Sequence, residues 1–165
     1  MIQECNRHWQ YQDTANGLIM PWYTLPTLQW LEKQDVKNWE VFEYGAGYST
    51  IWWRLSCECI DSVDHNSGWA KAMGARHSSE KQDYIDGYLF GRYFDCIIVD
   101  GEWRDECVSY SRDYVKSGGY MIVDNYDQED FPSSEVIDSL LSGWEKTVFA
   151  QPNHTSWKTA IFRKP

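Results

Sequence analysis

The chain has 165 residues and a mass of 19.5 kDa, which fits a single domain that can bury a core without disulfides. Hydrophobic residues make up 42% and aromatic residues 16% of the sequence, which excludes a disordered polypeptide. There are 15 Lys and Arg residues against 25 Asp and Glu residues, and the net charge of -10 disfavours nucleic-acid and anionic-membrane partners.

The five cysteines are odd in number and lack paired C-x-x-C spacing, so the sequence predicts neither a zinc site nor a disulfide framework. Residues 1–10 carry charged side chains and no apolar signal segment, and no stretch reaches about 18 apolar residues. We therefore expect a cytoplasmic protein with no membrane and no nucleic-acid partner. The sequence leaves its oligomeric state open.

The first half of the chain alternates between helical and extended patterns after a polar N-terminal segment, residues 1–19. Ile51, Trp52 and Leu55 are the expected apolar residues of a helix that follows the first strand. Residues 78–82 read as a polar linker, and residues 84–90 fit either a short strand or a helix. The remaining predictions are a helix over 23–33, a strand from Val41 leading into a helix over 49–55, a strand over 59–63, a helix over 69–76 and a buried strand over 93–99.

The second half continues the alternation and ends differently. Helical spacing over 103–116 stops at Gly118 and Gly119, a glycine signal typical of a helix C-terminus. A strand over 120–123 follows, and then a helix opened by Pro132 and closed by Gly143. Strands over 145–150 and 155–162 form a hairpin.

This order of elements predicts an α/β fold. Alternating strands and helices form a doubly wound, mostly parallel sheet with helices on both faces, and the last hairpin adds an antiparallel pair. We expect one domain over 1–165, with no internal repeat.

The stretch 41–50 predicts a strand, a tight turn at Gly45 and Gly47, and a helix N-terminus. Such a turn brings backbone amides close to a ligand, although it also occurs without one. Asp64, Asp100, and Asp124 with Asn125 end three further strands, and all four strand ends meet at one edge of a parallel sheet. Asp64 lies about 20 residues after Gly45, the spacing of an acid that binds ribose hydroxyls, with a helix cap as the alternative.

The residues around the turn also distinguish between cofactors. Thr50 stands where a dinucleotide site needs a third glycine, and no Gly-Lys-Ser/Thr motif for nucleoside triphosphates is present. Glu43, two residues before Gly45, would suit a cationic amine or sulfonium better than a pyrophosphate.

The motifs Glu43-Tyr-Gly-Ala-Gly-Tyr-Ser-Thr50, Val63-Asp-His-Asn66, Phe94-Asp-Cys-Ile-Ile-Val-Asp-Gly101 and Val123-Asp-Asn125 together resemble class I S-adenosylmethionine-dependent methyltransferases. The resemblance spans residues 20–163 in the correct order. It implies a Rossmann-like, seven-stranded sheet with a reversed last strand, S-adenosylmethionine as cofactor and methyl transfer. Because the chain carries no inserted recognition domain, we expect a small-molecule substrate.

The resemblance also implies roles for individual residues. Glu43, Gly45 and Gly47 would surround the methionine part of the cofactor. Asp64 would bind the ribose with His65 beside it, and Asp100 would lie near the methyl group and take part in catalysis. Asp83 or Asp86 would serve the adenine.

Asp100, Asp124 and Asn125 further resemble the metal ligands of catechol-type O-methyltransferases, which hold Mg²⁺ through oxygen atoms. The alternative is that Asp124 and Asn125 only cap a loop. His154, in the turn of the last hairpin, is the candidate general base, or else a solvated turn histidine. The aromatic residues expected to cover a sulfonium are Trp22, Tyr23, Tyr48 and Trp103.

Two other functions fit the same pattern. One is a non-catalytic module or partner subunit that binds an adenosyl ligand. The other is an aminopropyl transferase with Asp100 as acid and base. It would bind decarboxylated S-adenosylmethionine in preference to S-adenosylmethionine itself.

Overall fold

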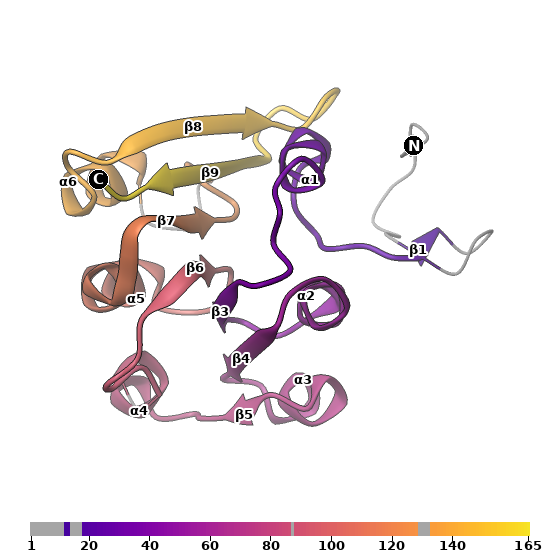
Figure 1. Ribbon diagram of the computed structural model, residues 1–165, viewed down its shortest axis with the longest axis vertical. Coiled ribbons are helices and arrows are strands. Elements are labelled where there is room, and N and C mark those ends of the chain that lie inside the picture. Colours follow the sequence, from indigo (N-terminus) through magenta and orange to yellow (C-terminus); the bar gives the residue numbers. More distant parts are fainter. Residues whose placement is uncertain (1–11, 14–17, 87, 129–132) are drawn as a thin grey trace.

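The fold was analysed in a computed structural model that describes residues 12–13, 18–86, 88–128 and 133–165. Its main sheet has seven strands in the order β5-β4-β3-β6-β7-β9-β8 (Figure 1). The strands are β3 (Glu40–Tyr44), β4 (Cys59–Asp64), β5 (Arg76–His77), β6 (Phe94–Val99), β7 (Val115–Val123), β8 (Glu145–Ala150) and β9 (Lys158–Arg163). A separate antiparallel pair joins β1 (Gln12–Asp13) to β2 (Leu18–Ile19).

Five neighbouring strands, from β5 to β7, are parallel, whereas β9 is antiparallel to both β7 and β8. Strand β8 therefore runs in the same direction as the parallel strands. The predicted mostly parallel sheet with an antiparallel hairpin at its end is confirmed.

Helices cover both faces of the sheet (Figure 1). On one face lie α1 (Leu25–Leu31), α2 (Tyr48–Ser56) and α3 (Ser67–Met73), and on the other α4 (Lys81–Asp86), α5 (Arg104–Ser111) and α6 (Ser134–Leu140). A short 3-10 helix, η1 (Arg112–Tyr114), connects α5 to β7. Of residues 84–90, which fitted either structure in the sequence, 84–86 form the end of helix α4 and 88–90 form a turn, while residue 87 lies outside the described residues.

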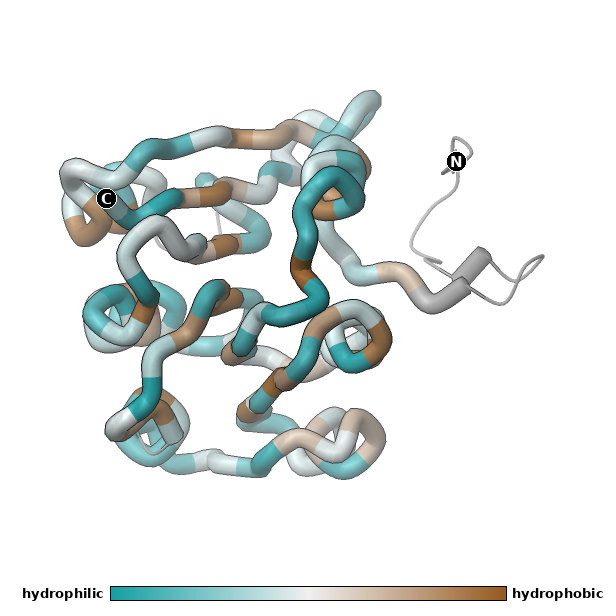
Figure 2. The backbone as a smooth tube through the Cα atoms, viewed as in Figure 1, coloured by the Kyte–Doolittle hydropathy of each residue, from teal (hydrophilic) through white to brown (hydrophobic). Residues whose placement is uncertain are grey.

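The sheet has one hydrophobic core on each face, because successive side chains along a strand point to opposite faces. In β3, Val41 packs with α1 and α2, while Phe42 and Tyr44 pack with the opposite helices. Both faces are buried, so the central strands β6 and β7 are apolar on both sides. Figure 2 shows hydrophobic residues recurring along the strands, whereas the turn between β8 and β9 is mostly hydrophilic.

Leu55, one of the apolar residues expected in helix α2, does not face the core. Helix α2 buries Ser49, Thr50 and Trp53, and the Trp53 side chain is 0% exposed. Leu55 is 82% exposed. The reason is that the helix faces the sheet through positions four apart, 49 and 53, which leaves Leu55 on the solvent side.

The predicted helix over 103–116 is too long. Helix α5 ends at Ser111, and β7 begins at Val115, so Gly118 and Gly119 lie inside a strand. The pairing of β6 with β7 shifts register here, and a Cβ on Gly119 would lie 2.8 Å from the Asp95 carbonyl oxygen. These glycines therefore form an irregularity of the sheet that requires close backbone approach.

The other differences are at element ends. The predicted helix over 69–76 stops at Met73 with Gly74 in a left-handed cap, and the chain then forms the unpredicted strand β5. Pro132 lies outside the described residues, and α6 begins at Ser134. Cys96 is a buried core residue, and the four described cysteines are free. Among the described residues, none of the helices is long and apolar enough to cross a membrane.

Candidate active site

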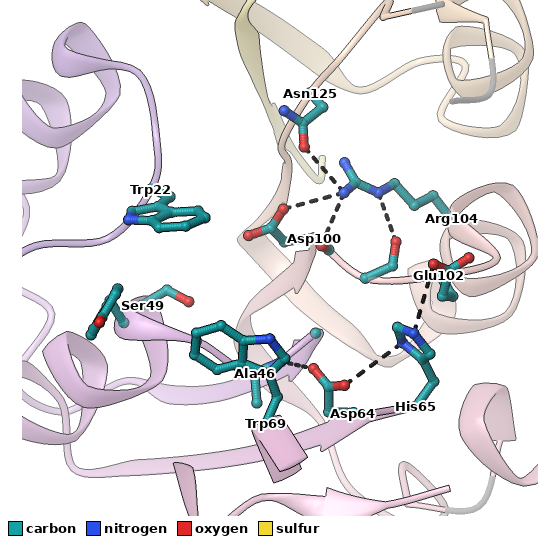
Figure 3. Close-up of a pocket in the computed structure, with 14 residues that line it drawn as sticks. Trp22, Ala46, Ser49, Asp64, His65, Trp69, Asp100, Glu102, Arg104 and Asn125 are labelled. Atoms are coloured by element: carbon teal, nitrogen blue, oxygen red, sulfur yellow. Dashed lines mark hydrogen bonds and ion pairs between the residues drawn. The ribbon is translucent and has the colours of Figure 1, made fainter. Parts of the chain in front are cut away.

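A cavity of about 350 Å³ opens at the carboxyl ends of strands β3, β4, β6 and β7 (Figure 3). The predicted convergence of strand ends is therefore real. The residues lining the cavity are Trp22, Gly45, Ala46, Gly47, Tyr48, Ser49, Asp64, His65, Trp69, Asp100, Gly101, Glu102, Arg104 and Asn125.

The turn between β3 and α2 forms one wall of the cavity. Gly45 has a φ of +91°, and a Cβ there would lie 2.7 Å from the backbone nitrogen of Gly101. Gly47 is the N-cap of α2, and a Cβ on it would meet only Ser49 Oγ, at 4.0 Å. Gly45 thus permits contact between the ends of β3 and β6. Gly47 has no side chain that would fill the cavity beside the N-terminus of α2.

Glu43 does not line the cavity, which makes its predicted contact with a cationic ligand wrong. Its carboxylate is fully buried and accepts hydrogen bonds from Ser49 Oγ (2.5 Å), Thr50 Oγ1 (2.5 Å) and Ser62 Oγ (3.0 Å). Burial raises the pKa of Glu43 to about 7, although the three hydroxyl groups lower it. The alternation in β3 directs this side chain, like that of Val41, under helix α2.

Asp64 is at the cavity, at the end of β4. Its Oδ2 accepts the Ala46 N-H (2.7 Å) and its Oδ1 accepts the Asn66 N-H (2.7 Å). The cap of α3 is Asn66, which accepts from two backbone amides of the helix, so the alternative role of Asp64 as helix cap is wrong. His65 Nδ1 lies 3.6 Å from Asp64 Oδ1, and its Nε2 lies 3.8 Å from Glu102 Oε1 (Figure 3).

Asp100 lies in the cavity wall at the end of β6 and forms an ion pair with Arg104, whose Nη2 is 3.3 Å from Asp100 Oδ1. Burial raises the pKa of Asp100 to about 6, and the Arg104 guanidinium opposes that increase. Arg104 is the first residue of α5 and is 4% exposed. A residue that the sequence analysis did not single out is therefore the main partner of Asp100.

Arg104 also binds the segments that follow β6 and β7 (Figure 3). Its Nε donates to the Gly101 carbonyl (2.9 Å) and its Nη2 to the Asp100 carbonyl (2.9 Å) and to Asn125 Oδ1 (3.2 Å). Its Nη1 donates to the Asp124 carbonyl. Because the guanidinium contacts oxygen atoms of all three predicted metal ligands, it holds the position that a Mg²⁺ ion would need.

The Asp124 side chain is turned away from this position. Its Oδ1 accepts from Thr159 Oγ1 (2.5 Å) and its Oδ2 from Trp157 Nε1 (3.5 Å). Burial and the nearby Asp100 raise the pKa of Asp124 well above its usual range. Within residues 12–13, 18–86, 88–128 and 133–165, no group of three His, Cys, Asp or Glu residues could hold a metal. The predicted Mg²⁺ site of Asp100, Asp124 and Asn125 does not fit.

Three aromatic side chains, those of Trp22, Tyr48 and Trp69, line the cavity. The Trp22 ring lies 6.0 Å from that of Tyr48, which lies 6.2 Å from that of Trp69. Tyr23 is instead fully buried, and its hydroxyl accepts from Trp53 Nε1 (3.3 Å). Trp103 packs on Tyr84 outside the cavity lining. Of the four predicted aromatic residues, Trp22 and Tyr48 are therefore at the cavity.

His154 is not among the residues that line the cavity, although β8 runs parallel to the central strands, so its role as general base stays a prediction. It lies exposed in the turn between β8 and β9, where its Nδ1 accepts the Trp157 N-H (2.9 Å). This bond orients the ring toward its own turn. Asp83 and Asp86 are in helix α4 and also lie outside the cavity lining.

Sequence reasoning missed Trp69, Glu102 and Arg104. Trp69 belongs to a short helix, and nothing in its pattern separates it from a core residue. Glu102 and Arg104 follow the Asp100-Gly101 motif within three residues, and this proximity was the available signal.

No protein-family model and no curated protein sequence matches the chain. Solved structures match it at low identity. The N-methyltransferase NodS from Bradyrhizobium japonicum WM9, in complex with S-adenosyl-L-homocysteine, has 14% identity and a TM-score of 0.60 over 82% of this chain and 81% of that one. The O-methyltransferase TomG from Streptomyces achromogenes, in complex with SAM, has 16% identity and a TM-score of 0.60 over 84% and 78%.

The T. thermophilus 16S rRNA N2 G1207 methyltransferase RsmC, in complex with AdoMet and guanosine, has 13% identity and a TM-score of 0.60 over 88% of this chain and 44% of that one. Together these likenesses show that the chain has the fold of class I S-adenosylmethionine-dependent methyltransferases, as the motifs predicted.

Proposed function

We propose that this protein is an S-adenosylmethionine-dependent methyltransferase that acts on a small molecule. The observation that carries this proposal is that the Gly45–Gly47 turn, Asp64 and Asp100, which follow three different strands, all line the same cavity. It lies where open α/β sheets bind their ligands. The shared fold supports the same reading, because the NodS and TomG structures hold S-adenosyl-L-homocysteine and SAM.

The lining residues fit the parts of this cofactor. Asp64 keeps acceptor capacity on both oxygens for ribose hydroxyls, since each oxygen receives one backbone N-H. Asp100 also lines the cavity, and we place it near the methyl group, as the resemblance implies. Glu43 acts indirectly, because it holds the hydroxyl of Ser49, which does line the cavity.

The bound cofactor supplies a sulfonium-linked methyl group that an acceptor atom attacks in line. Alignment and exclusion of water are the main requirements of such a displacement. The rings of Trp22, Tyr48 and Trp69 line the cavity, where they would limit the access of water and offer aromatic faces that attract a positive charge.

The small-molecule acceptor is supported by the charge of the chain and by the cavity. A net charge of -10 opposes a phosphate backbone, in contrast to what an rRNA-modifying enzyme such as RsmC has to bind. The cavity volume of about 350 Å³ also falls within the range of small-molecule sites.

Calorimetric titration with S-adenosylmethionine and S-adenosylhomocysteine tests the cofactor. We expect both to bind the wild-type chain and neither to bind the Gly47→Leu variant, whose side chain enters the cavity. Gly47→Ala is the matched control, since a methyl group there meets only Ser49 Oγ at 4.0 Å. Absence of binding to the wild-type chain would refute the proposal.

The acceptor is tested with methyl-labelled S-adenosylmethionine and a cell extract separated into metabolites, RNA and protein. We expect label in the metabolite fraction. Label in RNA or protein would contradict the small-molecule acceptor, and binding without transfer would indicate the non-catalytic module. Binding of decarboxylated S-adenosylmethionine in preference to S-adenosylmethionine would indicate the aminopropyl alternative.

A further inference from the structure

We propose that Arg104 is a built-in cation that takes the place of a divalent metal ion and positions the strand ends of the site. The statement about metal binding depends only on the geometry around Arg104. The statement about ligand affinity rests on the proposed function. The two are therefore tested separately.

The surroundings of the guanidinium are those of a cation site. Five oxygen atoms accept its N-H groups, and they belong to two neighbouring strand ends, after β6 and after β7. Backbone carbonyl, carboxylate and amide oxygens are also the ligands that Mg²⁺ and Ca²⁺ select. Here the positive charge is attached covalently to helix α5.

The backbone around Arg104 is shaped to deliver this charge. Trp103, immediately before it, has a φ of +49°, a left-handed conformation that is uncommon for a large side chain. Asn125, on the other side of the guanidinium, also has a φ of +49°. Arg104 thus follows one residue with a left-handed backbone and binds the side chain of another, Asn125, which is consistent with a site that the surrounding structure enforces.

A free divalent ion could not share this position. Mg²⁺ needs near-octahedral oxygen ligands at about 2.0–2.1 Å, and a guanidinium bound to the same oxygens repels it at short range. Asp124 supplies only its carbonyl, because its carboxyl group is bound by Thr159 and Trp157. The remaining carboxylate, Asp100, is already paired with Arg104.

The positioning role follows from which atoms Arg104 joins. Asp100, Gly101 and Asn125 all line the cavity, and each is bound by the same planar group. Lysine offers a point charge in place of a planar fork of donors, so it cannot hold these atoms at once. Arg104 therefore fixes the shape of the cavity wall between β6 and β7.

Titration of the wild-type chain with Mn²⁺, followed by electron paramagnetic resonance of the free ion, tests metal binding without a variant. Mn²⁺ prefers the same oxygen ligands as Mg²⁺. We expect an equimolar amount of protein to leave the free-ion signal unchanged. One equivalent of bound Mn²⁺ that disappears in Asp100→Asn would overturn the proposal, whether or not the chain binds S-adenosylmethionine.

The positioning role is tested by the affinity for S-adenosylhomocysteine. We expect Arg104→Ala to weaken binding roughly tenfold or more, and millimolar guanidinium chloride to restore most of it, while NaCl at the same ionic strength does not. Arg104→Lys, which keeps the charge, should show a smaller loss and serves if the alanine variant does not fold. Wild-type affinity in both variants would refute this role.

Discussion

At the residue scale, Gly45 and Gly47 have different tasks although they are only two positions apart. Gly45 adopts a left-handed conformation and contacts the backbone of Asp100 and Gly101, so a Cβ at this position would disturb the packing. Gly47 is extended and faces open space, so a small side chain would fit here and only a large one would fill the cavity. The sequence pattern treats the two as equivalent, and the structure separates them.

Gly45→Ala should therefore lower the free energy of unfolding by about 3 kcal/mol, from the left-handed φ and the 2.7 Å contact together. Gly47→Ala should stay within about 0.5 kcal/mol of the wild-type chain. Urea denaturation followed by circular dichroism measures both. Equal stability of the two variants would contradict this division of tasks.

Glu43 gives the molecule a pH-dependent stability. Its pKa in the folded state is about 7, above the usual 4.5, so the folded chain holds this proton more tightly than the unfolded chain does. The associated stabilisation is complete below pH 4.5 and is lost as the pH rises through about 7. The shift corresponds to about 3 kcal/mol.

Glu43→Gln should remove this component. We expect the loss of unfolding free energy between pH 5 and pH 8 to be smaller in the variant by roughly 2–3 kcal/mol, measured by urea denaturation at both pH values. Glu58→Gln, at an exposed position, is the matched control and should follow the wild-type curve. A variant curve parallel to that of the wild type would show that Glu43 titrates normally.

At the scale of elements, Trp53 is the large side chain through which helix α2 packs against the core. Trp53→Ala should cost about 4 kcal/mol, because the side chain is fully buried and contacts the rings of Trp39 and Trp52. Leu55→Ala, two residues later and 82% exposed, should cost less than about 0.5 kcal/mol. Comparable losses in the two variants, measured in urea, would indicate a different orientation of the helix.

The long buried strands could be predicted from the sequence because their apolar runs are local. Strand β6, with Phe94 and the run Cys96–Val99, is such a case. The two-residue strand β5 has no comparable signal, and its pairing with β4 is a tertiary contact. Gly118 and Gly119 are compatible with either a helix end or an irregularity in a sheet. The close approach of the Asp95 carbonyl, which only the fold shows, identifies the sheet irregularity.

The candidate site could also be predicted only in part. The convergence of Gly45, Asp64 and Asp100 follows from the direction of parallel strands, which the sequence already implied. The orientation of Glu43 depends on which face α2 covers. Arg104 reads in the sequence as a surface charge at a helix start, and only the fold shows that it is buried.

At the scale of the whole molecule, the net charge of -10 should oppose the compact state. We expect the midpoint of thermal unfolding to rise by about 3 °C when NaCl is raised from about 20 mM to about 500 mM. Exposed ion pairs such as Lys81–Glu106 weaken in salt but contribute little. A sucrose series at equal osmolality is the control, and a lower midpoint in salt would show that ion pairs dominate.

The position of β9 has a consequence for synthesis of the chain. Strand β9 comes after β8 in the chain, yet it lies between β7 and β8 in the sheet. A ribosome that has reached Ala150 has therefore made both outer partners while the strand that joins them does not yet exist. Until residues 158–163 are added, β7 exposes an apolar edge, and the nascent chain passes through a stage in which that edge can pair with a neighbour.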